Sequence, residues 1–217
     1  MCTVTMWKCL AFMCALATTA HSDSCCVPTQ FECSEGTMTG SADDDGNTAL
    51  AQALIKFSFD GNGKRVYSVE QVIVGNQSDT YTILQLYNQG QQYVIHNGVC
   101  SRGSLETWGN KGCIPDTATV SGTYQLGYGQ NIWITTYSWS IPSPTASVSL
   151  GVTDNCVPVV EIFTGQQEGT SFLALQGFQN ITLGIKDPSV FVVPDICKHQ
   201  STSVPVPMYR RRRSTLF

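Results

Sequence analysis

The sequence predicts a mostly β protein built on an antiparallel sheet. The segment from Ala53 to Asp60 alternates, with Ile55, Phe57 and Phe59 on one side and polar residues on the other, as a half-buried strand does. The residues Asp-Gly-Asn-Gly at 60–63 tolerate positive φ and lead into a second alternating run, which predicts a β-hairpin. The same pattern of short runs and turn residues repeats along the chain. The expected architecture is therefore an antiparallel sheet curled on itself, or a sandwich.

Nine or ten strands are expected. The segments are Ala53 to Asp60, Arg65 to Glu70, Thr80 to Asn88, Gln92 to His96, Thr123 to Tyr128, Asn131 to Trp139, Ala146 to Val152, Val157 to Phe163, Ser171 to Phe178 and Ile181 to Ile185. The stretch from Ser34 to Asn47 is rich in Gly, Ser and Asp, and is expected to be a loop or an irregular edge strand. Only short helices are expected, the best candidate being Thr48 to Leu54.

Several of these strands carry large side chains on both faces. In the segment 131–139, Trp133 and Tyr137 oppose Ile132 and Ile134. A strand that is apolar on both faces needs cover on both. Three structures provide that cover: the core of a sandwich, a ligand-lined concavity, or a subunit interface.

Residues 1–22 have the features of a secretory signal peptide. Lys8 precedes an apolar run from Leu10 to Ala17, and small residues follow it. The run is shorter than the roughly 20 residues that a membrane-spanning helix needs. Cleavage is expected after Ala20 or Ser22. The mature protein is expected to be secreted to the extracellular space, with the lysosomal lumen as the alternative destination.

The charge is low and unevenly distributed. Charged residues make up 13% of the chain and the formal net charge is −4. Because Arg210 to Arg213 lie together near the C-terminus, the rest of the chain is acidic, and nucleic-acid binding is not expected. One domain is expected at 23–200, followed by a disordered basic tail at 201–217. The arginine run is read as a cleavage site for secretory-pathway convertases, a contact for anionic glycans or lipid head groups, or a solvated run.

Seven cysteines remain after the signal peptide is removed. They are Cys25, Cys26, Cys33, Cys100, Cys113, Cys156 and Cys197. In an oxidising compartment this number predicts three disulfides and one leftover thiol, free or paired between chains.

No pattern of catalytic residues is found, and an enzyme is not expected. Away from the ends of the chain the only histidine is His96, and a lone histidine at a strand end is more often a surface or satisfied residue than a general base. Asp43, Asp44 and Asp45 form the densest acidic run and are the candidate calcium ligands. A solvated loop is the more frequent role of such a run, and no cofactor is required.

Two N-glycosylation sequons are present, at Asn76 and Asn180. Asn76 lies in a polar loop. Asn180 opens an expected strand, so a glycan there requires its side chain to face water.

The C-terminal third contains a distinctive run, Gly-Ile-Lys-Asp-Pro-Ser-Val-Phe at 184–191, followed by Pro194 and Cys197. Other motifs precede it: Cys25-x-x-Pro28-x-x-Phe31-Glu32, Tyr87-Asn88-Gln89-Gly90 with Tyr93 and Cys100, Ile114-Pro115, Trp139, and Cys156-Val157-Pro158-Val159. With these motifs in this order, the chain resembles the ependymin-related proteins over essentially the whole mature body. The closing motif is the most specific, and the others are persuasive in combination.

The resemblance implies a secreted, disulfide-bonded glycoprotein with a fold similar to the lipoprotein carriers LolA and LolB. That fold is a strongly curved antiparallel half-barrel with a hydrophobic pocket for lipid-like ligands, in which burial of an acyl chain contributes roughly 0.8 kcal/mol per methylene. The resemblance also implies a homodimer, calcium binding and extracellular-matrix contact. The candidate pocket residues are Phe57, Phe59, Tyr67, Leu84, Leu86, Tyr93, Trp133, Tyr137, Trp139 and Phe172.

Two disulfides are implied by the same resemblance, Cys25 to Cys156 and Cys100 to Cys197. The first would close a loop of about 130 residues, which the loop-entropy account equates with roughly 4 to 5 kcal/mol of stabilisation. The third bridge of the family uses cysteines that this chain lacks.

In its place a bridge from Cys33 to Cys113 is predicted, leaving Cys26 over. The alternative pairing is Cys26 to Cys113. A third staple of the family type is therefore not expected.

The function expected from these observations is that of an extracellular carrier or sensor of lipid-like ligands. The alternative is a calcium-dependent matrix, adhesion or signalling glycoprotein without a lipid cargo, whose apolar face makes a homodimer. Bound lipid would favour the first, and a calcium-dependent change in assembly would favour the second.

Overall fold

The computed structural model describes residues 25–198, except 106, 110, 130, 143, 144 and 168. The expected signal peptide at 1–22 and the expected tail at 201–217, with Arg210 to Arg213, lie outside the described residues.

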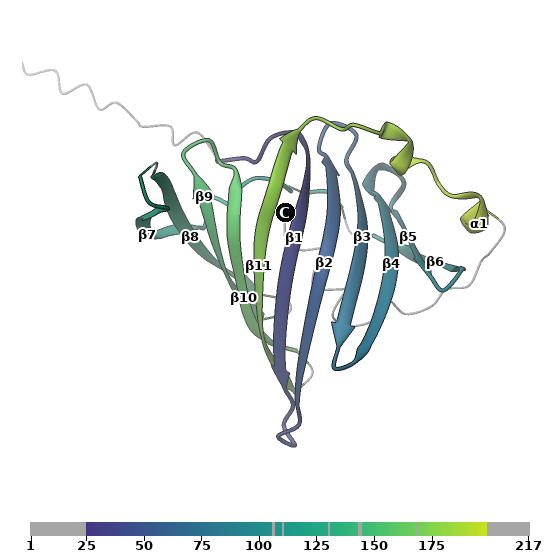
Figure 1. Ribbon diagram of the computed structural model, residues 1–217, viewed down its shortest axis with the longest axis horizontal. Coiled ribbons are helices and arrows are strands. Elements are labelled where there is room, and N and C mark those ends of the chain that lie inside the picture. Colours follow the sequence, from purple (N-terminus) through teal and green to yellow (C-terminus); the bar gives the residue numbers. More distant parts are fainter. Residues whose placement is uncertain are drawn as a thin grey trace, which may run out of the picture.

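Eleven strands form one antiparallel sheet in the order β6-β5-β4-β3-β2-β1-β11-β10-β9-β8-β7. The strands are β1 Gln30–Ala42, β2 Thr48–Asp60, β3 Arg65–Val74, β4 Gln77–Leu86, β5 Gln91–His96, β6 Val99–Ser104, β7 Thr119–Leu126, β8 Ile132–Pro142, β9 Thr145–Thr153, β10 Pro158–Gln167 and β11 Thr170–Leu183. Two meanders, β1–β6 and β7–β11, thus join through the pairing of β1 with β11. Figure 1 shows that the sheet is strongly curved. Its two edge strands, β6 and β7, do not pair with each other, so the sheet stays open. The expectation of a mostly β, strongly curved antiparallel sheet is confirmed.

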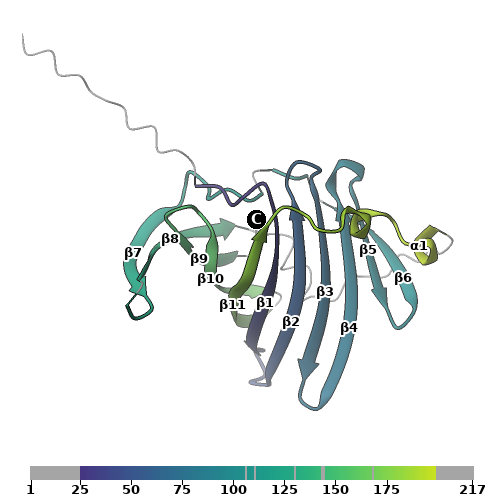
Figure 2. The same ribbon diagram turned by 45° about the horizontal axis from the view of Figure 1, so that its top comes forward.

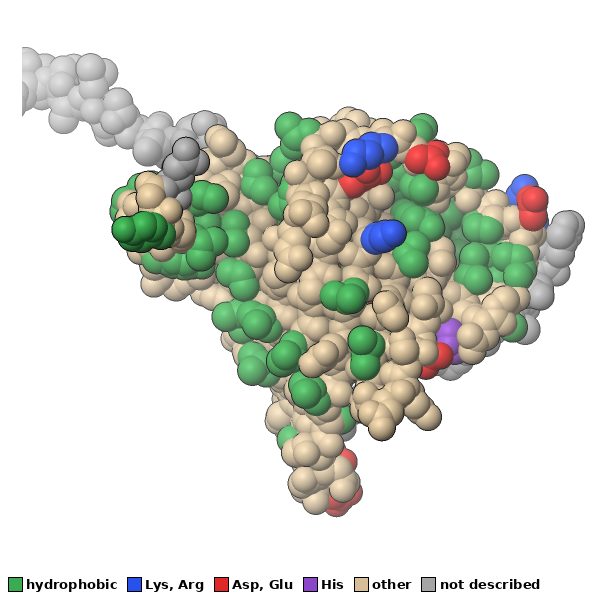
Figure 3. All heavy atoms as spheres, viewed as in Figure 1, with side chains coloured by type: hydrophobic (Ala, Val, Ile, Leu, Met, Phe, Trp, Pro, Cys, Tyr) green, Lys and Arg blue, Asp and Glu red, His purple; other side chains and the backbone are tan. Residues whose placement is uncertain are grey.

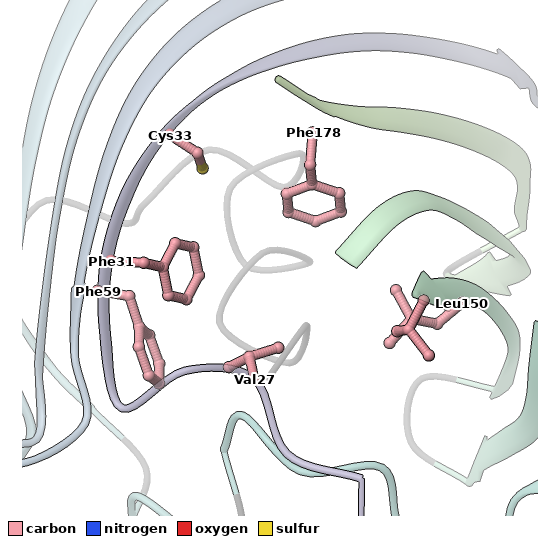
Figure 4. Close-up of a cluster of buried hydrophobic side chains, with 7 residues drawn as sticks. Val27, Phe31, Cys33, Phe59, Leu150 and Phe178 are labelled. Carbon is pink, nitrogen blue, oxygen red and sulfur yellow. The ribbon is translucent and has the colours of Figure 1, made fainter. Parts of the chain in front are cut away.

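The register between strands fixes which side chains share a face, because paired residues of an antiparallel sheet point to the same side. Glu35 of β1 is paired with Ile55 of β2 and Phe178 of β11, and this side faces the inside of the curve (Figure 4). We call it the concave face. The opposite side, which carries Met38 of β1 and Leu175 of β11, is the convex face.

Two expectations about the start of the domain are wrong. Most of the segment from Ser34 to Asn47 belongs to β1, which lies in the middle of the sheet. The segment from Thr48 to Leu54 is the start of β2 and not a helix. β1 escapes recognition because its concave positions include Glu35 and Thr37, while its convex positions include glycines, so no apolar alternation marks it.

Two further differences concern strand limits. β6 was not expected as a strand. The segments 171–178 and 181–185 were expected to be separate, but most of their residues lie in one strand, β11. The register of β11 against β1 shifts near Asn180, whose φ is 52°. This irregularity lies inside a continuous strand, but in the sequence it resembles a turn between two strands.

One end of the curve is closed by the N-terminal segment 25–29 and the loop 105–118. Backbone hydrogen bonds join Val27 N to Gly112 O at 2.7 Å and Ile114 N to Cys25 O at 2.8 Å. The disulfide Cys26–Cys113 links the same two segments. Trp108 of the loop packs against Phe59, so the loop also contributes to the core.

The C-terminal segment, 184–198, crosses the convex face over β3–β6 (Figure 2). It contains a 3-10 helix, η2 Pro188–Phe191, and a short helix, α1 Asp195–Lys198; a further 3-10 turn, η1 Tyr87–Gln89, follows β4. Buried Phe191 and Cys197 pack with Leu84 and Tyr93. The disulfide Cys100–Cys197 anchors the segment to β6.

The remaining bridge joins Cys25 to Cys156, which have a sequence separation of 131 and Cα atoms 5.5 Å apart. The two bridges implied by the family resemblance are thus both present. The predicted Cys33–Cys113 bridge is wrong, because Cys113 pairs with Cys26 and Cys33 is a buried free thiol. Cys33 points to the concave face from the middle of the sheet (Figure 4). Cys26 instead forms an isolated β-bridge with Cys113 of the loop.

Candidate ligand-binding face

The concave face is lined by apolar side chains from both halves of the sheet. Near the closed end, Phe31 of β1 stacks on Phe59 of β2 with ring centroids 5.3 Å apart. Phe178 of β11 and Leu150 of β9 complete this group from the other half of the sheet (Figure 4). Each strand directs alternate side chains to this side. The apolar residues at every second position of β2 and β9 therefore come together in this cluster.

A second apolar cluster lies toward the β10–β11 hairpin. Phe163 of β10 stacks on Phe172 of β11 at 5.4 Å, together with buried Ala146 and Val148 of β9. Trp139 of β8 is partly buried and packs against both this cluster and the one near the closed end. An apolar surface therefore runs along the concave face, with Trp139 connecting its two clusters.

Polar groups interrupt this apolar surface near its middle. Glu35 and Glu161 are 4% and 1% exposed, and the side-chain amide of Gln176 donates to Glu35 Oε2 at 3.1 Å. Neither carboxylate oxygen of Glu161 has a hydrogen-bond partner. Burial, and secondarily the nearby Glu35 carboxylate, raise the pKa of Glu161 well above its ordinary value. This setting therefore favours the protonated, neutral form of Glu161.

Cys33 lies beside this polar region, with Sγ 3.8 Å from Glu35 Oε1. Burial and the Glu35 carboxylate raise the pKa of the Cys33 thiol. The thiol is therefore protonated and unreactive at neutral pH.

Sequence reasoning missed Glu35, Glu161 and Gln176. A signal was present for Glu161, because it occupies the same phase of its strand as Phe163, where an apolar residue is expected.

The predicted pocket residues divide between the two faces. Phe57, Phe59, Trp133, Tyr137, Trp139 and Phe172 lie on the concave face. Tyr67, Leu84, Leu86 and Tyr93 lie on the convex face beneath the C-terminal segment. The structure thus places the first set on one face and the second set on the other. The sequence pattern could not assign these residues to the two faces. A shift of one residue in the pairing of a strand moves all its side chains to the opposite face, and the pattern does not fix the pairing.

The convex face contains a shallow groove of about 410 Å³ over β1, β2, β10 and β11. Its apolar walls include Met38, Leu54 and Leu175, which are 47%, 61% and 45% exposed. Gly36 and Gly177 are paired with each other at its floor, and a Cβ on Gly177 would meet nothing within 4 Å. Figure 3 shows hydrophobic side chains gathered over this part of the convex face.

The candidate calcium ligands lie in and beside the β1–β2 turn. The Asp43 carboxylate accepts hydrogen bonds from Asn47 N at 2.8 Å and Asn47 Nδ2 at 3.0 Å, and bonds of this kind lower the pKa of Asp43. Within the part of the chain that the structure describes, no group of three or more His, Cys, Asp or Glu side chains is arranged to hold a metal ion. Calcium binding by Asp43, Asp44 and Asp45 stays a prediction.

His96 is held by its neighbours. Its Nε2 lies 2.9 Å from Asp79 Oδ1, and its ring stacks on Tyr81 with centroids 4.2 Å apart. This is the satisfied setting that a lone strand-end histidine was expected to have. Both sequon asparagines, Asn76 and Asn180, are exposed.

These features define a class of protein: an open, strongly curved antiparallel sheet with an apolar concave face, stapled by three disulfides. The ependymin family model matches residues 75–197, which is more than half of the chain. The chain belongs to the ependymin family.

Comparison with known proteins adds one relative and two solved structures. Ependymin-related protein 1 of Haliotis asinina is 27% identical over 198 residues, covering 83% of this chain and 93% of its own. A beta-barrel-like protein of Brucella abortus, a domain of unknown function, has a TM-score of 0.36 and 8% identity, over 73% of this chain and 99% of its own. A LolA superfamily protein of Nitrosomonas europaea has a TM-score of 0.31 and 11% identity, over 76% and 91%. Likenesses at these TM-scores do not define a shared fold.

Among the described residues, no helix is long and apolar enough to cross a membrane.

Proposed function

We propose that this protein is a secreted binder of hydrophobic, lipid-like ligands, which it holds against the concave face of the sheet. The observation that carries the proposal is the apolar surface formed by the two concave clusters and Trp139. Burial of apolar surface is non-directional, so such a face accepts an alkyl chain without dedicated polar contacts.

The size of the effect favours long chains. Each methylene group removed from water contributes roughly 0.8 kcal/mol, so a chain of about ten methylenes gains enough to offset the entropy lost on binding. The ring of Trp133, which is 49% exposed on the concave side of β8, offers a flat surface for an alkyl chain. The affinity is therefore expected to rise steeply with chain length.

Export is supported by the three disulfides, which persist in oxidising compartments. The exposure of Asn76 and Asn180 is compatible with glycans at both sequons. Mass spectrometry of the protein from a eukaryotic secretory host, before and after glycosidase treatment, would test both points.

Quenching of tryptophan fluorescence by 12-bromododecan-1-ol tests ligand binding, because bromine quenches indoles that it contacts. The mature chain has Trp108, Trp133 and Trp139, and we expect saturable quenching that is largely lost in Trp139→Phe. The matched control is Leu175→Lys on the convex face, which should leave the quenching unchanged. Quenching that does not saturate, or that Leu175→Lys abolishes, would contradict binding at the concave face.

A second function is favoured by the convex groove. Three exposed side chains, Met38, Leu54 and Leu175, surround Gly36 and Gly177, and neither glycine has a positive φ that would require it. Contiguous exposed apolar surface of this kind is typical of interaction sites. We therefore propose that the groove is the interface of a homodimer, as an adhesion or signalling glycoprotein would need.

Sedimentation velocity tests this second function. We expect a dimer for the unmodified protein and a monomer for Leu175→Lys, because two lysines would be buried in the interface. Leu183→Lys, at a leucine that is 75% exposed and outside the groove, should remain dimeric. Calcium-dependent assembly would be visible in the same experiment with and without a chelator.

A further inference from the structure

An unpartnered carboxyl group lies inside the apolar concave face. Glu161 of β10 is 1% exposed, and both of its carboxylate oxygens are buried without a hydrogen bond. It is paired with Leu150 of β9 on one side and Gln176 of β11 on the other, so it points to the concave side. Burial of a polar group without a partner costs free energy, and burial of an unpaired charge costs far more.

Two more carboxyl groups share this region. Glu35 is near enough to Glu161 to act on it electrostatically. Glu70 of β3 and Glu35 of β1 both pair with Ile55 of β2, so these two glutamates lie in one row, roughly 10 Å apart at the usual strand spacing. Glu70 is 2% exposed. Three glutamates from different strands therefore face the same apolar concavity.

Basic side chains of the described residues are placed elsewhere. They lie on the convex face, as Lys56 does, or in loops and the C-terminal segment, as Lys111 and Lys198 do. Arg65 is paired with Asp60 at 2.6 Å, at the far end of its strand from Glu70. Within the described part of the chain, the concave face thus carries several carboxyl groups and no lysine or arginine.

We propose that the concave face selects hydrophobic ligands that carry a basic group, of the long-chain amine type, and that Glu161 accepts the ammonium group. This inference rests on the proposed ligand-binding function and names the ligand class. An ammonium ion would donate to the buried oxygens of Glu161, while the alkyl chain lies along the cluster of Phe163 and Phe172. A fatty acid would instead place its carboxylate beside the carboxyl groups of Glu35 and Glu161, with no basic side chain to pair with, and be rejected.

Binding changes the protonation of the site. Glu35 is the titratable group that acts on Glu161 electrostatically, and Gln176 and Leu150 are its direct neighbours across the sheet. Tyr137 of β8 lies in the same row, one strand beyond Leu150. Burial and the Glu35 carboxylate raise the pKa of Glu161 and so favour its neutral form when no cation is present. Pairing with an ammonium group favours the ionised form, so ligand binding is coupled to release of a proton from Glu161 to the buffer.

Isothermal titration calorimetry of the mature full chain with dodecylamine, dodecan-1-ol and dodecanoate, all below their aggregation limits, tests the proposal. We expect dodecylamine to bind at least about tenfold more tightly than dodecanol, since a buried charge-assisted hydrogen bond is worth at least that factor, and dodecanoate to bind more weakly than dodecanol. Titration in two buffers of different ionisation enthalpy should reveal proton release with dodecylamine alone.

Substitutions sharpen the result. Glu161→Gln should reduce the affinity for dodecylamine to that for dodecanol and abolish proton release, while dodecanol binding stays unchanged. Glu35→Gln, which keeps Glu161 intact, should retain most of the preference. Glu32→Gln on the convex face is the matched control, because its carboxylate contacts the Lys186 amide and not the concavity.

The outcomes separate the two proposals. Dodecanol binding without a preference for dodecylamine would overturn the amine selectivity and leave the lipid-binding function intact. Absence of binding by all three ligands would overturn both. If Glu161→Gln failed to fold, the order of the three affinities in the unmodified chain would still decide the selectivity.

Discussion

The two halves of the convex face are built from the same alternation of side chains, but only one half is covered. Over β3–β6 the C-terminal segment covers Leu84 and Tyr93, which are 2% and 7% exposed. Over β1, β2, β10 and β11 the corresponding positions include Leu54 and Leu175, which are 61% and 45% exposed. Apolar residues on both faces of a strand therefore have a different role in each half. In one half the C-terminal segment covers them, and in the other they form a surface that is open to a partner.

Breaking the Cys100–Cys197 bridge should have the largest effect on this comparison. The double substitution Cys100→Ser with Cys197→Ser opens a loop of 97 residues, which corresponds to a loss of about 4 to 5 kcal/mol in the free energy of unfolding. The C-terminal segment would also leave the convex face and expose Leu84. Urea unfolding and a hydrophobic dye measure the two effects, and an unchanged unfolding midpoint would show that the segment is held by packing alone.

Equivalent truncations on the two halves should differ sharply. Phe191→Ala removes a ring of the covering segment that is 4% exposed, and should cost about 3 kcal/mol of stability. Leu175→Ala, on the uncovered half, should change the stability of the monomer by less than about 0.5 kcal/mol. Chemical denaturation at dilute protein concentration compares them. Equal losses of stability in the two variants would contradict the comparison, because they would mean that Leu175 is packed as tightly as Phe191.

The covered half also depends on Asp60. Burial raises the pKa of Asp60, but hydrogen bonds from the Gly63 amide, the Gln30 amide and Arg65 outweigh it, and the pKa is lowered overall. Arg65 in turn lies over the ring of Phe191 at 4.3 Å. A lowered pKa stabilises the fold at neutral pH, and this stabilisation is lost as the pH falls below the ordinary value of about 3.9 and through the folded one.

The substitution Asp60→Asn should therefore cost about 1 to 3 kcal/mol at pH 7 and progressively less toward pH 2. Stability measured by urea unfolding across this pH range checks the sign. A constant difference between the two proteins would rule out the carboxylate as its source.

Glu161 should show the opposite dependence. Because its folded pKa is raised, the stability that this group contributes is fully present below the ordinary glutamate pKa and is lost as the pH rises toward the folded value. Glu161→Gln without ligand should thus stabilise the protein near pH 7 and not at pH 4. Thermal unfolding at the two pH values measures it; destabilisation at pH 7 would mean that the carboxyl group has a favourable partner.

The alternation of side chains predicted much of the sheet correctly. Ile55, Phe57 and Phe59 have the period of a strand and do lie on one face. β1 was missed because its place in the sheet comes from pairing with β2 and β11 and not from its own hydrophobicity. Faces could not be matched between strands for the same reason, since register depends on partners distant in sequence.

The candidate site was predicted only in part. Six predicted aromatic residues lie on the concave face, but the sequence could not separate them from Tyr67 and Tyr93 on the other side. The partner of Cys113 depended on how the N-terminal segment lies beside the loop 105–118. Glu161 carried a signal as a carboxyl group in an apolar phase, whereas the proximity of Glu35 required the register of β1, β11 and β10.

The central claim is that a hydrophobic ligand lies against the concave face. A crystal of the mature chain grown with 12-bromododecan-1-ol would test it directly through the anomalous scattering of bromine. We expect one bromine peak on the concave side, in contact with side chains of the clusters that contain Phe178 or Phe163. A peak confined to the convex groove beside Leu54 and Leu175, or no peak at saturating ligand, would contradict it.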